Sequence, residues 1–144
     1  MTAKEFLNQP FELQRLIKIK EKRIQCYREL ASCPASPSFE PHYAATRNTK
    51  APFERYLEKI NVLEEQLIND YAKLEYLKHE VDVAIDGMED PIEELVLRYR
   101  YSKLMKIEDI AREMNYSHRW IKRVHARALE HFERSHPSSP SGHC

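Results

Sequence analysis

The stretch that decides the fold is IEDIAREMNYSHRWIKRVHAR, residues 107–127. Its first part predicts a short amphipathic helix, because apolar residues recur at spacings of three and four: Ile107, Ile110, Ala111 and Met114. Asn115 and Tyr116 then predict a turn, since asparagine tolerates the left-handed backbone conformation better than most residues. Ser117 can cap a second helix through its side-chain oxygen. These signals predict two helices joined by a tight turn.

The second helix has an apolar face that suits the first. Ile121, Val124 and Ala128 lie three and four residues apart and are expected to point inward. Ala111 is small where two helices must cross closely, and the branched side chains fill the crossing. This pattern satisfies the steric requirements of a helix-turn-helix. We therefore predict a three-helix module over residues 88–134, with the helix-turn-helix in its C-terminal part.

The opposite face of the second helix is expected to face solvent. It carries the candidate DNA-binding residues His118, Arg119, Lys122, Arg123 and Arg127. Arginine pairs with guanine in the major groove through two hydrogen bonds, and lysine or arginine neutralises phosphates. Residues near the helix start usually reach base edges, so Arg119, Lys122 and Arg123 are the expected readers, and His118 can contact a base or a phosphate. Trp120 can stack on a sugar or close the core, and we favour the core.

Charge is distributed unevenly, although the chain of 144 residues has 23 basic and 23 acidic residues and a formal net charge of zero. Residues 81–97 hold six acidic residues and no Lys or Arg, whereas residues 98–134 hold ten basic and five acidic residues, a formal excess of +5. Residues 117–129 contain no acid at all. This asymmetry indicates a local site for a polyanion, with a solvated helix face as an equal alternative on charge alone.

Two longer helices are predicted before this module, which makes the fold class all-α. The apolar spacing predicts a helix over about residues 2–31, in which Pro10 is expected to separate a short first piece from the main one. Residues 53–85 predict the longest helix, with an apolar residue at every seventh position: Phe53, Ile60, Leu67, Leu74 and Val81. Residues 1–86 are expected to form an arm, either an antiparallel hairpin within one chain or a coiled coil with a second copy.

Local signals mark the segment ends. Four prolines predict a linker or loop at about residues 32–52, and the Pro- and Ser-rich tail, residues 135–144, is expected to be disordered. Asp90 and Pro91 predict an N-cap and a first helical residue. The helix that follows is expected to end near residue 101 and to bury Ile92, Leu95, Val96 and Tyr99. Glu93 and Glu94 are interpreted as acids at the positive end of this helix.

Residues 91–132 resemble region 4 of bacterial sigma-70 factors. The matching pieces are Leu97-Arg98-Tyr99, Asp109-Ile110-Ala111, the capping Ser117, and the sequence ARAL at residues 126–129. In that family the recognition helix reads promoter DNA, and its base-contacting positions fall on His118, Arg119, Lys122 and Arg123. The resemblance therefore implies a DNA-binding domain over residues 88–134.

The chain also departs from that family. Asn115 stands where the turn usually has glycine, and Arg119 stands where an acid is common, so a promoter preference does not carry over. The first 85 residues match no other sigma region, which argues against a complete sigma factor. A long helical arm joined to a region 4-like module is similar to small phage-encoded late transcription regulators of Gram-positive hosts (RinA/ArpU-like).

We therefore expect a sequence-specific regulator that binds the major groove of double-stranded DNA and activates late phage genes with host RNA polymerase. A repressor with the same DNA contact is an alternative, and so is an adaptor that binds polymerase without touching DNA. A protein-docking face would normally expose apolar anchors, which favours DNA for the basic face. Because one such module offers few base contacts, we expect a homodimer or joint binding with polymerase.

The sequence has no motif typical of an enzyme. A Gly-rich phosphate loop, an HExxH motif and a CxxC pair are all missing, and His125 and His131 are six apart, a poor ligand spacing on one helix. We expect no cofactor and no metal. The three cysteines are scattered, and Cys26 and Cys33 are interpreted as small buried hydrophobes. Without an apolar run of membrane-spanning length or a signal peptide, we expect a cytoplasmic protein.

Overall fold

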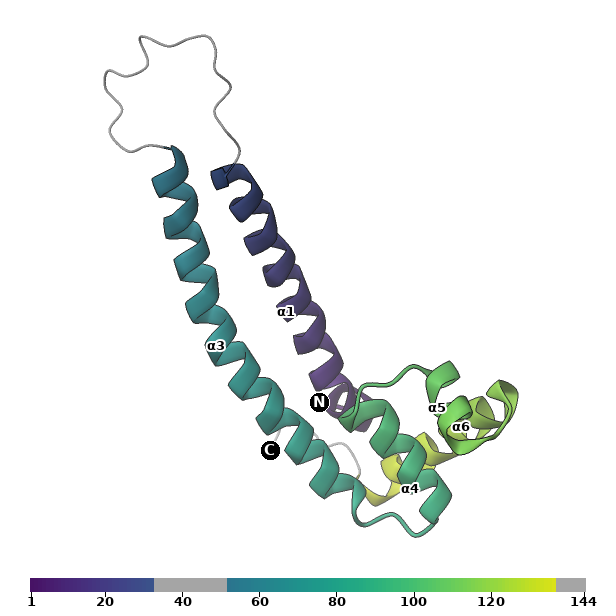
Figure 1. The fold of residues 1–144 in the computed structure, drawn as a ribbon. Helices are drawn as coiled ribbons and strands as arrows, with labels where there is room; N and C mark the ends of the chain where they lie inside the picture. The colour runs from purple at the N-terminus through teal and green to yellow at the C-terminus, as the bar shows by residue number, and fades with distance from the viewer. Residues whose placement is uncertain (33–51, 137–144) are drawn as a thin grey trace, which may run out of the picture. The chain divides into compact units, whose positions relative to one another are not determined.

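The computed structural model describes residues 1–32 and 52–136. Five α-helices and one π-helical turn form it: α1 (Ala3–Ser32), α3 (Pro52–Ile85), α4 (Pro91–Leu97), η1 (Arg98–Ser102), α5 (Ile107–Met114) and α6 (His118–Ser135) (Figure 1). No strand occurs in these two ranges, so the all-α prediction is confirmed for them. Two ranges lie outside the described residues: 33–51, which is most of the expected linker, and 137–144, which is most of the expected tail.

The chain divides into two compact units. Unit 1 comprises Met1–Gln14 and Lys73–Cys144, and unit 2 comprises Arg15–Ala72. The first and last residues of the expected arm, 1–14 and 73–86, thus belong to unit 1, which also holds α4, α5 and α6. The domain boundary between residues 86 and 88, which rests on sequence pattern, stays a prediction.

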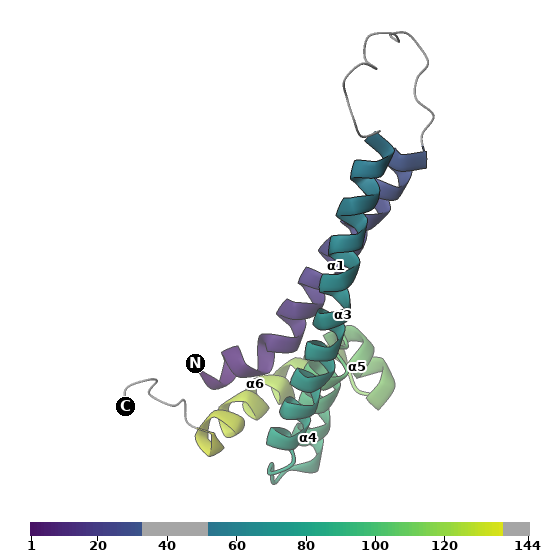
Figure 2. The same ribbon diagram turned by 90° about the vertical axis from the view of Figure 1, so that its left-hand side faces the viewer.

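Unit 2 contains segments of α1 and α3 that run antiparallel, as Figures 1 and 2 both show. Residues far apart in sequence meet in reverse order, with Lys20 Nζ 2.7 Å from Asp70 Oδ2 and Arg28 Nη2 2.8 Å from Glu64 Oε2. The residues buried within the unit are Ile17, Ile24, Ile60, Leu63 and Leu67. The seven-residue series is thus buried here at Ile60 and Leu67, but Phe53 at its start is 49 % exposed.

Two expectations for α1 are wrong. The helix runs unbroken through Pro10, although proline removes one backbone hydrogen bond. The Pro10 side chain is fully buried in unit 1, so its packing offsets the lost bond. Cys26 is exposed rather than buried, and Cys33 lies outside the described residues. Cys26 sits two residues after the buried Ile24, which turns it away from the apolar stripe.

Two clusters form the core of unit 1. The first joins α1, α3, the end of α4, η1 and α6, and contains Ala3, Leu7, Val81, Ile85, Leu97, Tyr101, Ala128 and Phe132. The second joins α4, α5 and α6, and contains Val96, Ile110, Ala111, Ile121 and Val124. Each cluster includes residues from the inward face of α6: Ala128 and Phe132 in the first, Ile121 and Val124 in the second.

The helix start at α4 follows the prediction, but its apolar face differs. The Asp90 side chain accepts hydrogen bonds from the backbone N–H groups of Ile92 and Glu93, and Pro91 is the first helical residue. Of the four residues expected inside, Val96 is fully buried, whereas Ile92 is 37 % exposed. Leu97 is fully buried instead, because the first cluster packs on the side of α4 opposite to Ile92.

Arg98 ties the end of α3 to α4 within unit 1. Its guanidinium lies 2.6 Å from Asp82 Oδ1, 2.8 Å from Asp86 Oδ1 and 2.6 Å from Glu94 Oε2. These carboxylates, led by Asp86, raise the pKa of Arg98 above its ordinary value. A single cation therefore forms ion pairs with three of the six acids in residues 81–97.

We predict that Ile121→Ala lowers the free energy of unfolding by about 2 to 5 kcal/mol, because the side chain is fully buried between α4, α5 and α6. Urea denaturation followed by circular dichroism measures this. The neighbouring exposed residue provides a control, since Lys122→Ala should change the free energy by no more than about 0.5 kcal/mol. Equal effects of the two substitutions would contradict the burial of Ile121.

Candidate nucleic-acid interface

The turn between α5 and α6 has the local geometry that the sequence predicts. Asn115 adopts the left-handed conformation, with φ 61° and ψ 39°, and ends α5. The backbone N–H of Tyr116 donates to the carbonyl of Ala111 at 3.0 Å. Ser117 caps α6, since its Oγ accepts a hydrogen bond from the backbone N–H of Trp120 at 3.0 Å. A left-handed Leu104, with φ 60°, precedes α5 and was not anticipated.

The inward face of α6 also follows the prediction. Ile121, Val124 and Ala128 have no exposed surface, and Ile110 of α5 has none either. Ile121 and Val124 share one cluster with Ile110 and Ala111. This packing fixes the rotation of α6 about its own axis.

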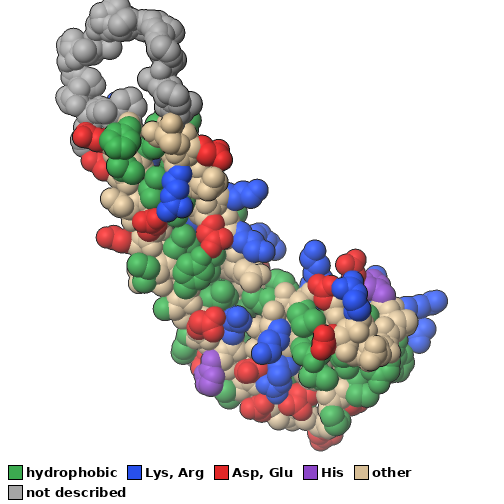
Figure 3. Space-filling view, viewed as in Figure 1, with side chains coloured by type: hydrophobic (Ala, Val, Ile, Leu, Met, Phe, Trp, Pro, Cys, Tyr) green, Lys and Arg blue, Asp and Glu red, His purple; other side chains and the backbone are tan. Residues whose placement is uncertain are grey.

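The five candidate residues all lie on the exposed side of α6: His118, Arg119, Lys122, Arg123 and Arg127. The first turn of α6 contains no acid. Within the described ranges, the first four make no ion pair or side-chain hydrogen bond. Figure 3 shows Lys, Arg and His side chains projecting from the region of α5 and α6, with acidic side chains among them. These four residues, His118, Arg119, Lys122 and Arg123, are called the basic face below.

Arg127 is held differently from the basic face. Its Nε lies 3.6 Å from Oε2 of Glu93, and its Cζ lies 5.6 Å from the centre of the Trp120 ring. The side chain is 49 % exposed, so it contacts both protein and solvent. Sequence reasoning grouped Arg127 with the free cations, because the position of α4 was not known.

Trp120 packs against the second cluster, in agreement with the favoured core interpretation. It also lies beside Tyr116, with the ring centres 6.1 Å apart. Its indole N–H is buried and has no hydrogen-bond partner among the described residues. The ring therefore forms a boundary between the core and the exposed side of α6.

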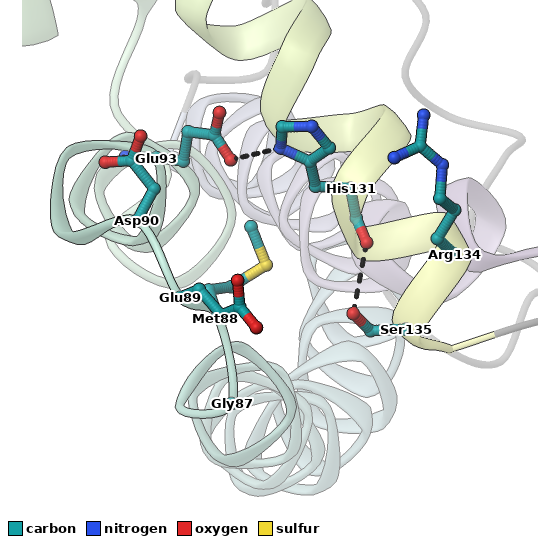
Figure 4. Close-up of a pocket in the computed structure, with 8 residues that line it drawn as sticks. All are labelled: Gly87, Met88, Glu89, Asp90, Glu93, His131, Arg134 and Ser135. Atoms are coloured by element: carbon teal, nitrogen blue, oxygen red, sulfur yellow. Dashed lines mark hydrogen bonds and ion pairs between the residues drawn. The ribbon is translucent and has the colours of Figure 1, made fainter.

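Glu93 lies in the first turn of α4, as the sequence predicts, but its burial was not predicted. It is 2 % exposed, and its Oε1 lies 2.7 Å from Nδ1 of His131, as Figure 4 shows. Buried carboxylates require partners, and both partners of Glu93 come from α6. A signal was present, because Val96 and Leu97 follow Glu93 at spacings of three and four and both are buried. A carboxylate on this face must meet whatever helix covers it.

His125 is half-buried and contacts Tyr101. Its Nε2 lies 2.7 Å from the hydroxyl oxygen of Tyr101, and the two rings stack with their centres 5.6 Å apart. Burial, and then the charges of Arg100 and Lys4, lower the pKa of His125 to about 4. Burial also raises the pKa of Tyr101. His125 is therefore a neutral structural residue at pH 7.

The scan against protein-family models and the searches of curated proteins and of solved structures found no match to this chain. The interpretation of the site therefore rests on its geometry. Among the described residues, no group of three or more His, Cys, Asp or Glu side chains is arranged to hold a metal ion. No helix in the described ranges is both long and apolar enough to span a membrane.

We predict that His125 makes the protein less stable as the pH falls. Its folded pKa of about 4 lies below the ordinary value of 6.5, so between these values the unfolded chain binds a proton that the folded chain does not. Stability should decrease as the pH is lowered from 6.5 to about 4. Urea midpoints measured at intervals across this range should fall less steeply for His125→Gln than for the wild type. Identical slopes would contradict the prediction.

Proposed function

We propose that the protein is a sequence-specific regulator of transcription that binds double-stranded DNA, with α5 and α6 as a helix-turn-helix and α6 in the major groove. The observation that carries the proposal is the basic face. Four residues that can contact bases or phosphates lie together on one exposed side of α6, and no acid of the described chain neutralises them. The rotation that the buried residues impose on α6 supports the same assignment.

Within this proposal the residues have different tasks. Arg119, Lys122 and Arg123 read base edges or neutralise phosphates, and His118, next to the N-cap, contacts a base or a phosphate. Arg127 lies about one turn beyond Arg123 on α6 and contacts the DNA backbone. The resemblance to sigma-70 region 4 supports an action at promoters together with RNA polymerase. Activation is favoured over repression on that resemblance alone, and a promoter reporter assay separates the two.

The proposal is a binding function, and we assign no catalytic step to the protein. An adaptor that binds polymerase without DNA is the competing function. Apolar side chains exposed in unit 2 give that alternative its support, since Leu16, Ile19, Leu30 and Val62 are 44 to 54 % exposed. The same residues are available to a second copy of the chain, and the proposal includes a homodimer.

We predict that Lys122→Ala/Arg123→Ala weakens binding to the duplexes that the wild type selects from a randomised DNA pool. Each lost phosphate contact should reduce the slope of log K against log salt by about 0.9, whereas a lost base contact should chiefly remove sequence preference. Fluorescence anisotropy at several salt concentrations measures both effects.

The matched control for this prediction is Lys18→Ala/Lys22→Ala, which removes the same formal charge from exposed positions in unit 2. It should leave the salt slope and the sequence preference close to those of the wild type. Equal losses in the two double variants would mean that α6 is not the DNA-binding element. If the wild type does not bind DNA at low salt, the groove-reading proposal fails and a polymerase subunit becomes the partner to test.

We predict further that the wild type sediments as a dimer at about 10 to 100 μM, the range of a weak dimer. Ile19→Glu/Val62→Glu should shift it toward the monomer, because charge is placed on two exposed apolar positions. Glu29→Gln, at an exposed polar position of α1, serves as the control. A monomeric wild type in this range would remove the homodimer from the proposal and leave joint binding with polymerase.

A further inference from the structure

We propose that Glu93 is a positioning residue for DNA binding, because it holds Arg127 in the orientation in which that side chain clamps a phosphate. The inference rests on the proposed function and names a residue that lies outside the basic face. It follows from a buried carboxylate on α4 whose two partners both lie on α6, one turn apart.

The first step is the need of the buried Glu93 carboxylate for polar partners. A carboxylate that is 2 % exposed has lost nearly all contact with water, and its charge must be met by partners in the protein. Arg127 and His131 supply them, at 3.6 Å and 2.7 Å. The close-up in Figure 4 shows the contact with His131, where the carboxylate of α4 reaches toward the ring on α6.

The second step is what this contact does to Arg127. The guanidinium meets the carboxylate through Nε and lies over the Trp120 ring. An arginine has five N–H donors in a rigid fork, so contact at Nε leaves the two terminal NH2 groups for another acceptor. No described residue accepts from them. The Arg127 side chain is 49 % exposed, so an acceptor in solvent can reach these terminal groups while Glu93 and Trp120 contact the rest of the guanidinium.

The third step is the match to phosphate. Two parallel N–H donors in one plane fit two oxygens of a phosphate, and a donor group that is already ordered loses less entropy on binding. A free arginine on an exposed helix would have to order its full side chain for the same contact. Glu93 therefore improves a phosphate contact although it carries the same charge sign as DNA.

The negative charge of Glu93 makes the inference testable. Removal of a carboxylate near a polyanion strengthens binding if only long-range electrostatics acts. If Glu93 positions Arg127, Glu93→Gln instead weakens binding to the selected duplex by about tenfold at moderate salt. Glu89→Gln is the matched control, since Glu89 is exposed, lines the pocket of Figure 4 together with Glu93 and His131, and pairs with neither Arg127 nor His131. It should bind as tightly as the wild type or slightly more tightly.

A double-mutant cycle separates positioning from a general loss of structure. In an Arg127→Ala background, Glu93→Gln should change the affinity by less than about twofold, because the residue through which Glu93 acts is missing. Arg127→Lys keeps the charge but loses the planar fork, and it should lose about as much affinity as Glu93→Gln. This second variant tests the inference even if Glu93→Gln does not fold, which circular dichroism reveals.

A direct readout uses the free protein. The Nε–H resonance of Arg127 in ¹⁵N-labelled protein should shift in Glu93→Gln and stay unchanged in Glu89→Gln. The inference is overturned if Glu93→Gln binds the duplex as tightly as Glu89→Gln does, if its loss persists in the Arg127→Ala background, or if the Arg127 resonance does not move. If the wild type binds no DNA, the proposed function itself fails. If the wild type binds and Glu93→Gln binds equally well, only the inference about Glu93 fails.

Discussion

The inward face of α6 is the constraint on which unit 1 depends. Ile121, Val124, Ala128 and Phe132 are each no more than 1 % exposed, at spacings of three, four and four along the helix. The first two belong to the cluster with α5, and the last two belong to the cluster with α1, α3 and η1. Since both clusters hold the same helix, α6 cannot rotate without emptying one of them. The opposite face is therefore presented to solvent by the packing of the core.

The acidic segment before Arg98 has a structural explanation. Asp82, Asp86 and Glu94 meet the guanidinium of Arg98, Asp90 caps α4, and Glu93 meets two residues of α6. Five of the six acids in residues 81–97 thus have an ion-pair or capping role within unit 1. The basic residues at the start of α6 are left without acidic partners in the described chain, and this imbalance is the physical basis of the proposed polyanion site.

The exposed side of α6 is graded along its length. The basic face near the N-cap has cations without partners, whereas Arg127 is braced by Glu93 and Trp120. His131 is paired with Glu93, and the half-buried His125 contacts Tyr101. The helix thus changes from an exposed chemical surface at its start to a packed structural element toward its end. Glu93 contacts α6 at Arg127, between its exposed start and its packed end.

Much of unit 1 could be predicted from sequence, because the deciding signals are local. The turn at Asn115, the cap at Ser117 and the inward spacing of Ile121 and Val124 depend on residues no more than a few positions apart, and helical geometry converts them into positions on a face. The exposure of the basic face followed from the same geometry. The long extents of α1 and α3 were predictable for this reason too.

Only the tertiary structure decided what each face meets. Pro10 stays inside α1 because unit 1 buries its ring, and Glu93 is a buried ion-pair partner because α6 covers that side of α4. These outcomes depend on contacts between segments 30 or more residues apart. A local sequence pattern predicts which side of a helix is apolar, but it does not predict which helix will pack against that side. The sequence by itself determined the helices and their apolar sides, whereas the partners of their polar residues came from the packing of helix against helix.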